Sequence, residues 1–300
     1  MLNTERLGLG TVQWGMSYGI SNQSGLATSD TVKKILQQAQ DANVKILDTA
    51  WAYGNAEGVL GEHNCLADGF DIVTKTQPLK GMSGIPEEKA EQVEKSFHLS
   101  LKQLGGNHVY GLLVHHADDL LGKAGEAIWS RLSRLKQEGF IKKIGCSLYS
   151  PDQLSLLIDL YDLDIVQLPY NIYDQRFTKS GLAKQTKDLG IEVHARSAFL
   201  QGLLLMPPEK LPTHFSSLVK HHAALWKEYT NLEVTPLEAA LGFSLSCSSI
   251  DKVIVGCEQV SQWDEILKIS NDSLPQNVIS KLELFAIENE DFINPSRWAK

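Results

Sequence analysis

Four side chains that could deliver a proton to a carbonyl oxygen lie in three apolar segments of the sequence. Asp48 and Tyr53 belong to the segment Ile-Leu-Asp-Thr-Ala-Trp-Ala-Tyr, Lys75 ends Asp-Ile-Val-Thr-Lys, and His115 ends Leu-Leu-Val-His. A Lys beside a Tyr can make the phenol a proton donor near neutral pH, and a nearby carboxylate can keep the Lys charged. These residue types therefore suit the reduction of a carbonyl group, provided that the fold brings them together.

Short apolar runs alternate with longer amphipathic stretches along the whole chain, which is typical of parallel β/α units. We expect strands at residues 6–11, 44–48, 72–75, 109–115, 143–147, 165–168, 191–195 and 252–255. Helical patterns follow them at residues 28–42, 57–66, 87–104, 122–138, 151–161, 179–189, 235–246 and 261–269. Eight such units favour closure into a (β/α)8 TIM barrel over an open sheet.

Two segments exceed this pattern. Residues 206–232 form too long a connection and contain several prolines, so we expect an extra helix at 214–229 before the last unit. The tail after Ile279 predicts another helix and a terminal loop. Because no linker-like composition interrupts the chain, we predict the α/β class and a single barrel domain spanning residues 1–300.

In a barrel of this kind, functional loops leave the C-terminal ends of the strands. Asp48, Lys75 and His115 would end the second, third and fourth strands, and Tyr53 would lie in the loop after the second. Each residue alone has a structural explanation, such as a turn cap, a solvated strand end or a core histidine. Their equivalent positions on neighbouring strands favour one shared site at the barrel mouth.

Composition limits the partners and the compartment. The net charge of -8 argues against a nucleic-acid or anionic-membrane partner, and no apolar stretch reaches the roughly 20 residues of a membrane span. The N-terminus shows no secretory signal. The cysteines are widely spaced, which fits reduced thiols in a cytoplasmic protein better than disulfides or a metal site; they are Cys65, Cys146, Cys247 and Cys257.

Several short motifs occur in a characteristic order. They are Leu-Gly-Leu-Gly-Thr-Val-Gln-Trp-Gly from residue 7, Leu-Asp-Thr-Ala-Trp-Ala-Tyr-Gly from 47, Thr-Lys from 74, Leu-Val-His-His-Ala-Asp-Asp from 113, Ile-Gly-Cys-Ser from 144, Val-Gln-Leu-Pro-Tyr-Asn from 166 and Gln-Gly-Leu-Leu from 201. With these motifs the chain resembles the aldo-keto reductase superfamily over nearly its whole length. The resemblance implies an NAD(P)H-dependent oxidoreductase that reduces an aldehyde, ketone or sugar carbonyl to an alcohol, or catalyses the reverse oxidation.

The resemblance also assigns roles to the four residues. Asp48, Tyr53, Lys75 and His115 match the catalytic tetrad of the family, each at its motif position. Tyr53 would donate the proton, and Lys75 would lower the pKa of its phenol from about 10. Asp48 would fix Lys75, and His115 would orient the carbonyl oxygen.

A nicotinamide cofactor, NADP(H) or NAD(H), is implied across the barrel mouth. Ser147 and Gln167 match the usual carboxamide contacts, while Leu148 stands where Asn is common and Arg196 where an aromatic often stacks on the nicotinamide. Arg196 could stack on the reduced ring, which would favour reduction, or form a salt bridge in the mouth. The expected cofactor contacts are Thr11, Ser147, Gln167, Arg196, Ser197, Phe199, Gln201, Gly202, Gly256, Cys257, Glu258, Gln262 and Glu265.

The adenosine end leaves the choice of cofactor open. Family members that prefer NADPH commonly place Lys or Arg there to pair with the 2′-phosphate. This chain offers Gly256, Glu258 and Gln262 at the corresponding positions. Glu258 would repel a phosphate but could accept hydrogen bonds from a ribose hydroxyl, so the residues favour NADH where the family favours NADPH.

Trp14 and Trp51 are the expected substrate contacts, with further walls from Phe215, Trp226 and the C-terminal segment 292–298. The substrate would be a small carbonyl compound, and the sequence fixes neither its identity nor the oligomeric state.

Two other functions stay open. The first is a catalytically weak, nicotinamide-binding regulatory subunit. The second is a metal-assisted lyase or hydrolase that uses His115-His116 and Asp118-Asp119. That second function is disfavoured because neighbouring residues of a strand point to opposite faces.

Overall fold

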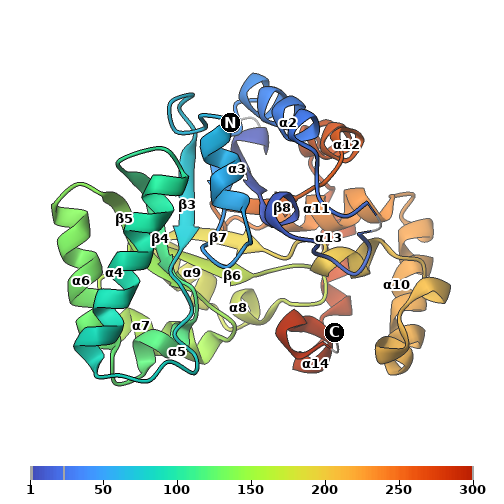
Figure 1. Cartoon of the computed structure of the whole chain (residues 1–300). Helices are drawn as coiled ribbons and strands as arrows, with labels where there is room; N and C mark the ends of the chain where they lie inside the picture. Colours follow the sequence, from blue (N-terminus) through green and yellow to red (C-terminus); the bar gives the residue numbers. More distant parts are fainter. Residues whose placement is uncertain (1–2, 23, 299–300) are drawn as a thin grey trace.

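The computed structural model describes residues 3–22 and 24–298. In this part of the chain, eight parallel strands close a barrel in sequence order, with the last strand paired to the first (Figure 1). The strands are β1 (Leu7–Gly10), β2 (Ile46–Asp48), β3 (Asp71–Lys75), β4 (Val109–Val114), β5 (Ile141–Ser147), β6 (Ile165–Pro169), β7 (Glu192–Arg196) and β8 (Lys252–Gly256). This confirms the predicted (β/α)8 barrel.

Each strand is followed by a helix that packs on the outside of the barrel (Figure 1). These helices are α2 (Ser29–Asp41), α3 (Ala56–Glu62), α4 (Pro86–Gln103), α6 (Gly125–Gln137), α7 (Pro151–Leu160), α9 (Leu182–Asp188), α11 (Pro236–Ser246) and α12 (Val260–Ser270). Three short helices precede some of them: α1 (Val12–Gly15), α5 (Ala117–Leu121) and α8 (Arg176–Lys179). The expected helix at 179–189 is interrupted because Gly181 takes a φ of 79°, a left-handed conformation that ends α8 and starts α9.

Local capping explains where two of these helices begin. The Ser150 side chain accepts a hydrogen bond from the Gln153 amide at 3.3 Å, and Pro151 occupies the first helical position of α7. Thr235 caps α11 in the same way through the Glu238 amide at 3.2 Å.

Inside the barrel, a small apolar cluster fills the space below the mouth; it consists of Ile46, Val73, Leu113, Ile165 and Ile254. The inward-pointing residues at the C-terminal ends of the strands lie above this cluster and can form a site.

The extra helices are also present: α10 (Val219–Asn231) lies before the last unit, and α13 (Gln276–Leu282) and α14 (Glu290–Ile293) follow it. α10 begins later than expected because residues 213–218 form a 3₁₀ helix. It is fixed by the buried His222, whose Nε2 lies 2.7 Å from the Met206 carbonyl oxygen and whose Nδ1 lies 2.7 Å from the Tyr173 hydroxyl. No helix within residues 3–22 and 24–298 is long and apolar enough to cross a membrane.

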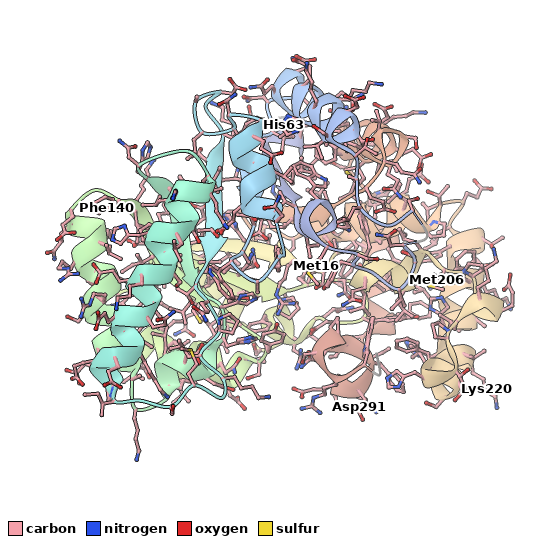
Figure 2. The ribbon with its side chains drawn as sticks, in the orientation of Figure 1. Met16, His63, Phe140, Met206, Lys220 and Asp291 are labelled. Carbon is pink, nitrogen blue, oxygen red and sulfur yellow. The ribbon has the colours of Figure 1, made fainter. Side chains whose placement is uncertain are left out.

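The C-terminal segment packs against this insertion and not over the barrel mouth. Phe215 contacts Trp298 edge-on at 4.9 Å between ring centroids, and His214 Nε2 lies 3.4 Å from the Asp291 carbonyl oxygen. Figure 2 labels Lys220 of the insertion and Asp291 of the tail in the same lower right part of the molecule. The expectation that these aromatics wall the substrate pocket is therefore corrected, because they pack on one another.

Candidate active site

The side chains at the C-terminal ends of β2 and β3 form a buried ion pair. Lys75 Nζ donates to both carboxylate oxygens of Asp48, at 2.8 and 2.7 Å, and to the Thr49 carbonyl oxygen at 2.9 Å. Lys75 and Asp48 are 1% and 4% exposed. All three N–H donors of the ammonium are thus used within the protein, and its charge is balanced by the neighbouring carboxylate.

Tyr53 reaches this pair from the loop after β2. The loop turns sharply at Gly54, which has a φ of 59° and approaches the Gly15 carbonyl so closely that a Cβ would lie 2.2 Å from its oxygen. The Tyr53 ring centroid lies 5.0 Å from Lys75 Nζ and 6.1 Å from the His115 ring, which it meets edge-on. The four residues of the expected tetrad therefore converge at one point of the mouth.

The protonation state of Tyr53 differs from the expectation. Burial raises the pKa of the phenol, and the Asp48 carboxylate raises it further. These two effects outweigh the lowering by the neighbouring positive charge of Arg196, and a lowering by Lys75 stays a prediction. Tyr53 accordingly holds its proton well beyond neutral pH and is suited to give it to a stronger base, such as a developing alkoxide.

His115 is the neutral member of the site. Burial, helped by the charge of Lys75, lowers the pKa of its imidazole to about 3. Its Nδ1 is buried and has no hydrogen-bond partner. A neutral imidazole can still donate a hydrogen bond through one ring nitrogen, so His115 can orient a carbonyl oxygen without becoming a cation.

This pair of shifts predicts a flat pH profile for reduction. Between about pH 5 and pH 9 we expect kcat to stay nearly constant, because His115 titrates near 3 and Tyr53 keeps its proton above its ordinary value of about 10. The measurement is kcat across this range in wild type and in His115→Gln. An inflection near the ordinary histidine pKa that disappears in His115→Gln would contradict a neutral imidazole.

A cavity of about 650 Å³ extends from the tetrad toward the start of α12. It is lined by Asp48, Tyr53 and His115, and by most of the expected cofactor contacts: Thr11, Ser147, Gln167, Arg196, Ser197, Phe199, Gln201, Gly202, Gly256, Glu258, Gln262 and Glu265. Lys75 lies just beneath the lining, behind Asp48. The sequence thus identified nearly the whole length of one continuous cavity.

The end of the cavity nearest the tetrad offers a partner for an amide group. Gln167 is fully buried, and its Nε2 donates to Asp48 Oδ1 at 2.7 Å. Its Oε1 is buried and has no hydrogen-bond partner among the described residues. Ser147 lies next to Gln167 in the register of β5 and β6. A buried orphan acceptor is costly unless a ligand satisfies it, so these residues fit the carboxamide of a nicotinamide.

The segment after β7 carries backbone strain where it lines the cavity. Ser197, Leu200 and Gln201 have φ values of 63°, 49° and 55°, which non-glycine residues rarely adopt, and Gly202 follows at 91°. Such conformations cluster at ligand sites. The Gln201 side chain donates to the Tyr18 hydroxyl at 3.0 Å, and so ties this segment to the loop after β1. The loop after β7 and the loop after β1 together fit the middle part of an extended cofactor.

The far end of the cavity is acidic. Gln262 Nε2 donates to Glu258 Oε1 at 3.0 Å, and Gln262 Oε1 accepts from the Glu258 amide at 3.0 Å. Glu265 also lines this end. Among the described residues that line the cavity, Arg196 is the only Lys or Arg, and it lies at the end near the tetrad. No cation of the lining is therefore available here for a 2′-phosphate.

Three expected contacts lie outside the cavity. Trp14 is 3% exposed within the core, and its indole N–H donates to the Cys257 carbonyl oxygen at 3.1 Å. Cys257 is equally buried, so both residues support the wall from behind. Trp51 is 39% exposed and lines a separate surface groove beside Leu99. These three predictions are corrected because the short helix α1 turns Trp14 inward and the loop after β2 turns Trp51 outward.

Arg196 contacts an aromatic ring and a main-chain carbonyl within the described chain. Its guanidinium lies 4.4 Å from the Tyr149 ring centroid and donates to the Leu148 carbonyl oxygen at 2.9 Å. The expected salt bridge is wrong, because no carboxylate of the described residues pairs with it. Stacking on a nicotinamide stays a prediction.

Several lining residues were not predicted as contacts of a reductase site, among them His116 and Tyr149. Each of these two directly follows a motif position, His115 and Leu148, which is the signal that could have identified them. The His115 and His116 rings stack at 4.9 Å, because β4 ends at Val114 and the alternation of a strand no longer applies. No group of three or more His, Cys, Asp or Glu in the part of the chain that the structure describes is placed to hold a metal ion.

Comparisons with known proteins agree with this geometry. A sequence model of the Aldo/keto reductase family matches residues 6–286. The chain is 28% identical over 226 residues to the NADH-specific methylglyoxal reductase of Escherichia coli, which covers 68% of this chain and 66% of that protein. It is 25% identical to the L-galactose dehydrogenase of Arabidopsis thaliana, covering 94% of this chain and 90% of that protein.

The fold is shared with solved structures at low sequence identity. An aldo-keto reductase of Bacillus halodurans in its holo form superposes with a TM-score of 0.73 at 18% identity, covering 98% of this chain and 95% of that one. A glycerol dehydrogenase of Gluconobacter oxydans gives 0.71 at 20% identity, covering 97% and 92%. The family match spans most of the barrel, so the chain belongs to the aldo/keto reductase family and is an NAD(P)-dependent carbonyl-reducing oxidoreductase.

Proposed function

We propose that this enzyme uses NADH to reduce a small aldehyde, ketone or sugar carbonyl, or catalyses the reverse oxidation, with Tyr53 as proton donor. The observation that carries the proposal is the convergence of Tyr53 and His115 over the Asp48–Lys75 pair at one end of a cavity whose other end presents Glu258. The relatives named as a reductase and a dehydrogenase support an active enzyme over a regulatory subunit.

The roles follow from the contacts. Reduced nicotinamide supplies the hydride when bound, and Gln167 and Ser147 would hold its carboxamide. His115, neutral, donates a hydrogen bond to the substrate oxygen and fixes its position. The Tyr53 O–H bond breaks and its proton passes to that oxygen as negative charge develops there. The phenolate left behind faces the Lys75 ammonium, which Asp48 keeps charged and oriented.

Electrostatics favour the direction of reduction. The phenol of Tyr53 is protonated at neutral pH, which is the form that reduction needs. Arg196 places an unpaired positive charge at the same end of the cavity, where it would disfavour the cationic oxidised ring relative to the neutral reduced ring. Both effects support reduction as the working direction.

The walls around the tetrad suit a small polar substrate. They include Met16, Tyr18 and Pro78, which combine apolar surface with the polar hydroxyl of one phenol. The related methylglyoxal reductase and L-galactose dehydrogenase are named for compounds of this size class. We also propose a cytoplasmic location for the enzyme, because all four cysteines are free thiols.

Cofactor preference is tested at Glu258. We expect wild type to use NADH at least about tenfold better than NADPH in kcat/KM, because a carboxylate opposing a phosphate at this end costs on the order of 1 kcal/mol or more. Glu258→Lys should narrow or reverse that ratio. Kinetics with both reduced cofactors measure it, and Glu209→Lys, the same charge change on an exposed 3₁₀ helix outside the cavity, is the control. A wild-type preference for NADPH would refute the proposal.

A further inference from the structure

The imidazole of His115 has no hydrogen bond to orient it within the described chain. Its Nδ1 is buried without a partner, and the bond from its backbone N–H to Thr76 Oγ1, 3.2 Å long, fixes the main chain only. Catalytic histidines are usually held by a hydrogen bond to the second ring nitrogen, which sets both tautomer and orientation. Something else must hold this ring.

Ring stacking takes the place of that hydrogen bond. The His116 ring lies nearly parallel to the His115 ring, at 17° and 4.9 Å between centroids. The His116 ring also stacks with Tyr149, at 21° and 6.0 Å between centroids. Arg196 then covers Tyr149 with its guanidinium at 4.4 Å. We call these four residues the mouth stack; it runs from the end of β4 across the β5 loop to the end of β7.

The outer members of the mouth stack are anchored by hydrogen bonds, through the main chain at Tyr149 and through the guanidinium at Arg196. The Tyr149 amide donates to Gln153 Oε1 at 2.9 Å, and the Tyr149 carbonyl oxygen accepts from the Arg176 guanidinium at 3.1 Å. Arg196 donates to the Leu148 carbonyl oxygen and to Ser197 Oγ, at 2.9 and 3.3 Å. His116 therefore stacks with both the Tyr149 ring and the His115 ring, so a rotation of His115 out of the stack loses its contact with His116.

We propose that His116 and Tyr149 are positioning residues that hold the His115 imidazole at the angle needed to bind a carbonyl oxygen. The inference rests on the proposed role of His115 in carbonyl reduction. His116 acts through the contact of its flat ring with the His115 ring. A flat, non-titrating ring should therefore replace it, whereas an aliphatic side chain of similar volume should not.

Steady-state kinetics distinguish a flat ring from an aliphatic side chain at position 116. His116→Leu is expected to lower kcat/KM for the carbonyl about tenfold, because a ring contact of this kind is worth up to roughly one factor of ten in an equilibrium. His116→Phe should stay within about twofold of wild type. Tyr149→Leu should act in the same direction as His116→Leu. The dissociation constant of NADH, from fluorescence titration, should not change in the two His116 variants. His63→Leu, which removes a half-buried histidine at the end of α3 outside the cavity lining (Figure 2), is the matched control.

A double-mutant cycle tests whether His116 acts through His115. In the His115→Gln background, His116→Leu should lower kcat/KM no further, because the ring it positions is gone. Additive losses would show that His116 touches the substrate directly and would overturn the proposal. Equal losses in His116→Phe and His116→Leu would overturn it as well.

Nuclear magnetic resonance of ¹⁵N-labelled histidine tests the mouth stack without turnover. The His115 ring signals should shift in His116→Leu and return toward their wild-type positions in His116→Phe. Unchanged His115 signals in His116→Leu would refute the positioning role whatever the enzyme reduces. If the signals shift as expected but no carbonyl is reduced by wild type, the proposed function fails and the positioning role stands.

Discussion

Replacing Tyr53 with Phe is expected to lower carbonyl turnover by about 10²–10⁴-fold, the range over which a positioned general acid contributes. The change removes one oxygen and leaves the ring, so the contacts to Lys75 at 5.0 Å and to His115 at 6.1 Å persist. Cofactor binding should survive, because the phenol hydroxyl forms no part of the carboxamide or adenosine contacts. The measurements are kcat for a panel of aldehydes, ketones and sugars, and NADH binding by fluorescence.

Tyr18→Phe is the matched control for this result. Tyr18 also lines the cavity, and its hydroxyl accepts a hydrogen bond from Gln201 at 3.0 Å, on the loop that closes over the middle of the cavity. Its loss should alter NADH affinity more than kcat. Near-wild-type turnover in Tyr53→Phe would mean that another group supplies the proton, and the assignment of the tetrad would then be wrong.

The barrel and the placement of the tetrad were predictable because the information is local. Each β/α unit carries its own periodicity and its own boundary residues, such as Ser150 and Pro151 at the start of α7. Once eight units close, the residue that ends a strand must point to the mouth. Asp48 and Lys75 end β2 and β3 and are placed by this rule, and His115 directly follows the last residue of β4.

The errors concern contacts between distant parts of the chain. Trp14 faces inward because its indole meets the Cys257 carbonyl, a partner that no local pattern reveals. The pKa of Tyr53 is raised because the phenol is buried and lies near the Asp48 carboxylate, which depends on the path of the loop after β2. The stacking of His116 on His115 required knowing that β4 ends one residue before His115.

Removing Lys75 is expected to cause the largest loss of stability. Lys75→Met leaves Asp48 buried, at 4% exposure, with Gln167 Nε2 as its remaining side-chain donor in the described structure. Breaking a buried pair in this way costs about 3–5 kcal/mol in the free energy of unfolding, because a charge is left without compensation. Urea denaturation followed by tryptophan fluorescence measures it, and turnover should fall as well because the Tyr53 phenolate loses its cation.

The double variant Lys75→Met/Asp48→Asn separates the two effects. With both charges gone, the amide of the new Asn can still accept from Gln167, and the buried site holds no unpaired ion, so most of the lost stability should return. Turnover should stay low, since nothing then stabilises the Tyr53 phenolate. Recovery of turnover together with stability would show that Lys75 serves the fold alone. A double variant as unstable as Lys75→Met would show instead that the loss comes from packing of the Lys75 side chain and not from the buried charge.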